Sequence, residues 1–150
     1  MKKYLLTAFL LCTLTGLKAQ HSKKMKNDIQ DSTAIANSLE DFYFKGIYEG
    51  NLDLLNQVFN TGTLLFGDVK GQPYAKTLEQ YLDGVKNRQS PKDSGKSFKG
   101  EIISVKLVNS IAVAEVKVKM YDFNYHEFLS FHKLNNSWLI VNKMISDTNE

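Results

Sequence analysis

The ten residues IAVAEVKVKM at positions 111–120 decide the fold class. Alanine, valine and methionine hold the even positions, whereas Glu115, Lys117 and Lys119 give the odd positions a charged character. This period of two residues is that of a β-strand with one buried and one wet face. The stretch therefore predicts a half-buried strand, and its lysines predict a solvated outer face.

Neighbouring segments extend this strand into an antiparallel sheet. Residues 102–108 precede it across Asn109-Ser110, a two-residue connection typical of a hairpin. Residues 125–134 and 138–145 form a second hairpin across Asn135-Asn136, where asparagine tolerates the positive φ of a tight turn. These segments predict a meander of four strands.

Apolar residues recur with the period of an α-helix in the first half of the chain, at Ile35, Leu39, Phe42, Tyr43, Gly46 and Ile47. We expect this helix to end at Gly50, and a short second helix to start after Asn51 as its N-cap. A capping-box pattern from Thr77 to Gln80 opens a third helix that runs to about Arg88.

The rest of this half connects the helices to the meander. Residues 63–69 are strand-like and end in a turn at 70–73, and residues 89–100 read as a loop. Three helices and a mostly antiparallel sheet predict an α+β domain with the helices packed on one face of a curved sheet. A sheet of this kind can enclose a pocket on its concave side.

The N-terminus has the pattern of a secretory signal peptide over residues 1–19. Two lysines precede an apolar run too short to span a bilayer, and small residues end at Ala19, where we expect cleavage. Residues 20–30 are predicted to be a flexible leader, and residues 31–150 the folded domain. The chain is thus expected to be exported, without a membrane span. The lone Cys12 follows Leu11, which is too large for the small residue that a lipoprotein signal usually has there.

Removal of residues 1–19 changes the charge and the chemistry of the chain. It takes away three lysines, so the 19 basic residues fall to 16 and equal the 16 acidic ones. A neutral net charge gives no support for a basic surface that binds nucleic acid, and no nucleic-acid partner is expected. Removal also takes away the single cysteine, which excludes disulfides and thiolate metal sites. We expect neither a metal nor another cofactor.

The order of elements resembles the putative lumazine-binding family of the nuclear transport factor 2-like superfamily. The stretches that carry the resemblance are FYFKGIYEGNLDLLNQVFN at 42–60, GQPYAKTLEQYLDGVKNRQSPKDSG at 71–95 and NNSWLIVNK at 135–143. The resemblance implies a cone of three N-terminal helices on a curved sheet. It specifies no function, because this scaffold hosts isomerases, dehydratases, cyclases and binding domains.

Ketosteroid isomerase, a member of this superfamily that is also a standard example of carboxylic-acid catalysis, provides a test of the enzyme hypothesis. The resemblance places its tyrosine at Tyr43, seven residues before Gly50. Its base falls on Gly67, and the adjacent Asp68 would point to the opposite face of the strand. Its second acid falls on Ser130. Two of the three groups are absent, which disfavours that mechanism.

The sequence favours a non-catalytic protein that binds a small apolar or aromatic ligand between the first helix and the sheet. The expected lining is Tyr43, Ile47, Phe66, Tyr81, Ser130 and His132. The alternative is a dehydratase-like or cyclase-like enzyme that uses Tyr43 and His132, because a histidine can act as a base near neutral pH. A third hypothesis is an interaction role, in which the outer face of the sheet around Val113 pairs two copies in a homodimer.

Overall fold

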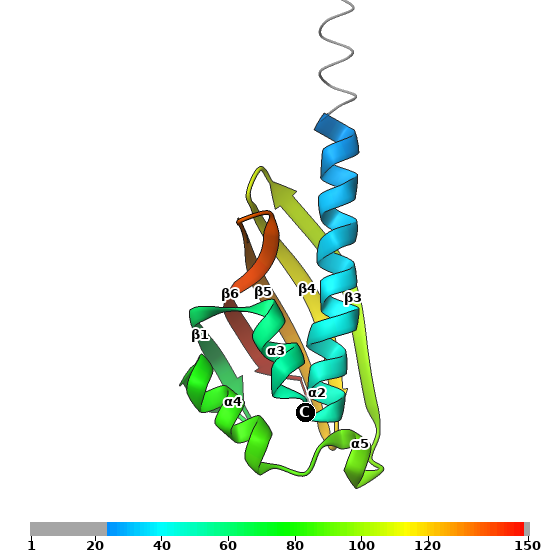
Figure 1. Cartoon of the computed structure of the whole chain (residues 1–150). Coiled ribbons are helices and arrows are strands. Elements are labelled where there is room, and N and C mark those ends of the chain that lie inside the picture. The colour runs from blue at the N-terminus through cyan, green and yellow to red at the C-terminus, as the bar shows by residue number, and fades with distance from the viewer. Residues whose placement is uncertain (1–23, 149–150) are drawn as a thin grey trace, which may run out of the picture.

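Six strands form a single sheet, and the helices cover one face of it (Figure 1). The structure, a computed structural model, describes residues 24–148. The strand order is β2-β1-β6-β5-β4-β3, with every neighbouring pair antiparallel except β1 and β6. The predicted α+β class and the helix-on-sheet arrangement are confirmed.

The elements follow one another in the expected order. The strands are β1 Phe59–Val69, β2 Gln72–Thr77, β3 Phe98–Val108, β4 Ile111–Met120, β5 Phe123–Leu134 and β6 Ser137–Asp147. The helical segments are residues 24–38, the π-helical turn η1 Leu39–Phe44, α2 Lys45–Glu49, α3 Leu52–Val58, α4 Leu78–Asn87 and α5 Pro91–Ser94.

The first three helical segments form one continuous rod along the sheet (Figure 1). Its buried face has a side chain at every fourth residue, Ile35, Leu39, Tyr43 and Ile47, each at most 2% exposed. The rod ends at Gly50, whose left-handed φ of 66° suits glycine. The helical segment and its end at Gly50 are as predicted.

The rod begins earlier than the sequence indicates. Residues 24–30 are helical, whereas a flexible leader was expected over residues 20–30. This stretch, KMKNDIQ, contains neither glycine nor proline, and a helix already nucleated downstream extends at little cost. Residues 20–23 of the leader, the signal peptide at 1–19 and its cleavage site lie outside the described residues.

Helices α3 and α4 start at the predicted caps. The Asn51 side chain accepts hydrogen bonds from the backbone N–H groups of Asp53 and Leu54. Thr77 and Gln80 form the reciprocal bonds of a capping box. Both helices then present apolar residues to the sheet, and α4 lies over the end of the sheet formed by β1 and β2 (Figure 1).

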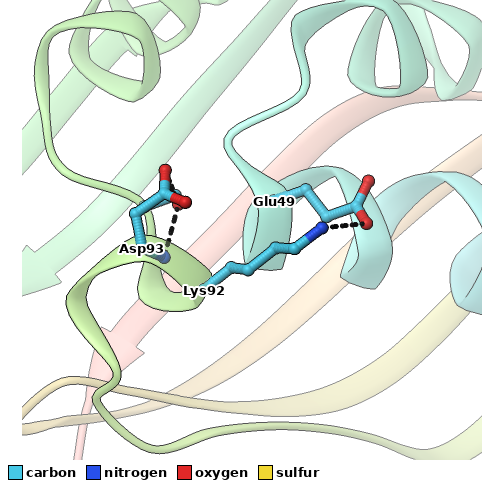
Figure 2. Close-up of polar contacts among 4 residues, drawn as sticks. Glu49, Lys92 and Asp93 are labelled. Carbon is cyan, nitrogen blue, oxygen red and sulfur yellow. Dashed lines mark hydrogen bonds and ion pairs between the residues drawn. The ribbon is translucent and has the colours of Figure 1, made fainter.

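Two short elements occur where the sequence predicts turns and loops. Strand β2 pairs with β1 at the edge of the sheet, where Pro73 is tolerated because one side of the strand has no partner. Helix α5 starts at Ser90, which caps it with its hydroxyl. Lys92 of α5 then reaches Glu49 at the end of α2, with Nζ 3.2 Å from Oε1 (Figure 2).

The side chain of Asp31 connects the N-terminal part of the rod to the β5–β6 hairpin. Its Oδ1 accepts hydrogen bonds from Lys133 Nζ at 2.6 Å and from Trp138 Nε1 at 3.1 Å. The hydrogen bond from Lys133 holds the pKa of the Asp31 carboxyl below its usual value. The bond from Trp138 acts in the same direction.

The contact of Asp31 predicts a pH-dependent loss of stability. At pH 7, Asp31→Asn is expected to lower the free energy of unfolding by about 1 kcal/mol, because it removes a half-buried ion pair. Since the folded-state pKa is lowered, this contribution is full above the unfolded pKa of about 3.9 and is lost as pH falls through the folded value.

Urea unfolding of wild type and variant at pH 7 and pH 3 measures this contribution. The difference between them should shrink at pH 3, and an equal difference at both pH values would contradict the assignment. Asp41→Asn, at an exposed position of the same rod, is the control and should have little effect at either pH.

Candidate functional site

Three polar side chains meet inside the domain, between the rod and the sheet. Lys143 Nζ of β6 lies 2.6 Å from Glu127 Oε1 of β5 and 2.6 Å from the Tyr43 hydroxyl of η1. The Tyr43 hydroxyl donates to Glu127 Oε2 at 2.6 Å. The Lys143 and Glu127 side chains are 3% and 1% exposed. A buried ion pair is thus closed by a phenol that bonds to both partners.

The phenol of Tyr43 is protonated at neutral pH. Burial raises the pKa of its hydroxyl well above the usual range, and the charge of Glu127 raises it further. The ammonium of Lys143 also lies 5.2 Å from the centre of the Tyr43 ring and 5.3 Å from that of Tyr81. The cation is therefore held by a carboxylate and two aromatic rings.

A cavity of about 210 Å³ lies beside this cluster, between α4 and the sheet. Tyr81, Val85 and Arg88 come from α4 and its C-cap. Glu127 and Lys143 belong to the sheet wall, and the remaining lining residues are Ile47, Val69, Tyr74, Lys76, Gly84, Val118, Met120, Tyr125 and Ile145. The rod supplies only Ile47, so α4 provides more of the wall than the expected first helix does.

The six predicted lining residues divide between the two faces of the sheet. Ile47 and Tyr81 line the cavity, and Tyr43 lies behind Lys143 and Glu127. Phe66, Ser130 and His132 lie on the opposite face. Ser130 pairs with Val113 and His132 with Ile111 in the β4–β5 register, and both partners point away from the core. Phe66 is 43% exposed.

Tyr43 and His132 are thus separated by the sheet, and the predicted pairing of these two residues in catalysis is wrong. The error has one source, the choice of which face of β5 points inward. Even-numbered residues of β4 are buried, and they pair with Leu129 and Phe131 of β5. Glu127 shares the parity of these two residues, so it faces the core.

Asp68 of β1 points away from the cavity, as expected. Its carboxylate accepts a hydrogen bond from Ser146 Oγ at 2.9 Å on the outer face of the sheet.

The residues predicted to line the site did not include Glu127, Lys143 or Arg88. The alternation of β4, carried across the hairpin to β5, contained the signal for Glu127. Lys143 had a weaker signal, because the register between β5 and β6 shifts where Val141 of β6 is left unpaired, between the pairs Phe131–Ile140 and Ser130–Asn142, and simple alternation along β6 fails there. Arg88 lies at the end of α4, where an arginine usually faces solvent.

The cavity also holds an unusual cation. The Nε and Nη2 atoms of Arg88 are buried and have no hydrogen-bond acceptor within the described part of the chain. Metal binding has no comparable feature, since residues 24–148 contain no group of three His, Cys, Asp or Glu side chains placed to hold an ion. The groups available at this site are cationic and phenolic.

Comparison with protein families identifies the chain. The profile of the family described as "Putative lumazine-binding" matches residues 30–146. The chain belongs to this family. A comparison with curated protein sequences gave no match.

Solved structures share the fold of this chain. A nuclear transport factor 2-like protein of unknown function from Silicibacter pomeroyi has 18% identity and a TM-score of 0.72, over 80% of this chain and 98% of that one. A similar protein of unknown function from Shewanella baltica has 20% identity and a TM-score of 0.71, over 81% and 97%. At such identities the similarity establishes the fold alone.

The buried ion pair predicts a large loss of stability when one partner is removed. Lys143→Met is expected to lower the free energy of unfolding by about 3–5 kcal/mol, because Glu127 keeps its charge in the interior without the ammonium. Combining it with Glu127→Gln should restore part of the loss, since the amide oxygen still accepts from Tyr43 and the unpaired charge is gone.

The control is an ion pair of similar length on the surface. Lys99 Nζ lies 2.7 Å from Glu101 Oε2, with side chains 70% and 51% exposed. Lys99→Met should leave the free energy of unfolding nearly unchanged, because solvent screens an exposed pair. Urea unfolding of all four proteins measures these values. A double variant less stable than Lys143→Met would contradict the assignment.

Proposed function

We propose that this chain is an exported, non-catalytic domain that binds a small molecule in the cavity between α4 and the sheet. The main support is a cavity of about 210 Å³ in which Glu127, the only carboxylate that residues 24–148 contribute to the lining, has both oxygens hydrogen-bonded. A general base needs a free lone pair directed at the substrate. The Glu127 side chain is 1% exposed and bonded to Lys143 and Tyr43, so little of its carboxylate is open to a substrate, which favours binding over proton transfer.

The walls of the cavity support a flat ligand. Tyr74, Tyr81 and Tyr125 present aromatic surface from a strand, a helix and a second strand. Aromatic rings on several sides, with a few polar groups, are typical of sites for small planar molecules. The volume is below the usual range for drug-sized ligands, so the expected ligand has one or two rings.

Export is part of the proposal and depends on the signal-peptide pattern of residues 1–19. Among residues 24–148, no helix is long and apolar enough to cross a membrane. The mass of the protein recovered from outside the cytoplasm should equal that of a chain starting at Gln20. A full-length mass would contradict this part.

A thermal-shift screen tests the binding function. Planar heterocycles of one or two rings are expected to raise Tm by about 5 °C when present well above their Kd, whereas sterols should be too large. Val85→Trp places an indole in the cavity and should abolish the shift. Glu79→Trp, at an exposed position of the same helix, is the control and should preserve it. No shift with any compound would refute the proposal.

We further propose that two copies pair through the outer face of the sheet. This face exposes large apolar side chains on β1, β4, β5 and β6, namely Leu64, Phe66, Ile111, Val113, Phe128 and Met144, each between 43% and 59% exposed. Contiguous apolar surface of this kind marks an interaction site. The same fold presents this face equally in both copies, which suits a two-fold symmetric dimer.

Light scattering at micromolar concentration tests the dimer. The wild type should have the mass of two chains, and Phe128→Lys should have the mass of one, because a charge at the centre of the face would be buried on pairing. Ile29→Lys, at an exposed apolar position on the rod, is the control and should remain dimeric. A monomeric wild type would contradict the proposal.

A further inference from the structure

The guanidinium of Arg88 has one edge turned into the protein and left without a partner. Its Nε and Nη2 atoms are buried, and neither donates a hydrogen bond to any group among residues 24–148. These two atoms carry the parallel N–H groups that bind both oxygens of a carboxylate at once. Buried donors are almost always satisfied in folded proteins, so this edge requires an explanation.

Among residues 24–148, the lining of the cavity offers no free anion for that edge. Glu127 is the one acid among the lining residues, and its two oxygens are taken by Lys143 and Tyr43. The lining holds three cationic side chains, Lys76, Arg88 and Lys143, against one carboxylate, an excess of two positive charges. An excess of this kind in a sheltered site attracts an anion.

The tyrosines of the cavity do not supply the missing negative charge. Burial raises the pKa of Tyr74, Tyr81 and Tyr125, and the charge of Arg88 lowers each of them by less. All three phenols therefore remain neutral at pH 7. They leave the positive charge uncompensated and offer flat apolar surface together with hydroxyl donors.

The volume limits what accompanies the anionic group. A cavity of about 150 Å³ is known to accept benzene in another protein. The cavity here, of about 210 Å³, has room for one ring and a carboxylate attached to it. The aromatic walls would thus contact the ring of one ligand molecule, and the guanidinium edge would bind its carboxylate.

We propose that the ligand of this cavity is a monocyclic aromatic carboxylate, with its two oxygens bound side-on by Nε and Nη2 of Arg88 and its ring between the tyrosines. This inference rests on the proposed binding function and names the class of ligand. In the bound complex the carboxylate satisfies the orphan donors and neutralises part of the charge excess.

Isothermal titration calorimetry on the purified protein at pH 7 tests the ligand class, with benzoate and nicotinate as probes. Benzamide, the neutral counterpart of benzoate, and inorganic phosphate are the comparison ligands. Benzoate or nicotinate is expected to bind at least tenfold more tightly than benzamide or phosphate. This comparison uses only the wild type, so it holds even if a variant fails to fold.

Substitutions of Arg88 test the contact. Arg88→Gln should abolish the preference for benzoate over benzamide. Arg88→Lys keeps the charge but cannot make the bidentate contact, so most of this preference should be lost as well. The matched control is Lys86→Gln, which removes a positive charge from the exposed side of the same helix and should leave affinity within about twofold. Circular dichroism confirms that each variant is folded.

The results separate this inference from the proposed function. If benzamide binds as tightly as benzoate, or if Arg88→Gln leaves benzoate affinity unchanged, the carboxylate class is wrong while binding in the cavity stands. If phosphate binds as tightly as the ring compounds and competes with them, the site takes a phosphate instead and the inference is overturned. If neither these probes nor the screened heterocycles bind, both proposals fail.

Discussion

The ion pair between Lys143 and Glu127, closed by the Tyr43 hydroxyl, joins the rod to two neighbouring strands of the sheet. Burying two charges is expensive, and only mutual contact together with hydrogen bonds to the remaining atoms compensates for it. The distances among the Lys143, Glu127 and Tyr43 side chains must therefore stay close to those observed. This requirement holds the rod against β5 and β6 and fixes one wall of the neighbouring cavity.

The same contact determines which groups of the cavity are free to meet a ligand. Glu127 is neutralised by its ion pair with Lys143. The Lys143 ammonium also contacts the rings of Tyr43 and Tyr81. Arg88 enters from the opposite wall with a buried edge that nothing in the described part of the chain satisfies. The site thus combines a Lys143–Glu127 pair that balances its own charge with a guanidinium edge that has no partner among the described residues, an arrangement suited to holding an anion in place.

Local sequence patterns predicted most of the helices and strands, because each pattern depends on residues that are neighbours in the sequence. The apolar spacing from Ile35 to Ile47, the cap at Asn51 and the capping box at Thr77 appear in the structure as expected. Strand β2 was missed because its order comes from pairing with β1 across an edge, and its own residues carry only the signal of a turn. The helix at residues 24–30 was missed because a polar stretch can extend a helix without any apolar period.

The sequence by itself determined the fold class and the two-faced character of the sheet, since alternation in β4 and helical periodicity are local consequences of backbone geometry. Only the tertiary structure decided which face encloses the cavity. A strand shows the same alternation whichever side the helices cover, so Ser130 and His132 were predicted to lie inside, whereas the packing puts them outside. The partnering of Glu127 with Lys143 and the unpaired edge of Arg88 depend on contacts between distant segments. The unpaired Val141 also breaks the simple alternation along β6 that would have placed Lys143 on the inner face.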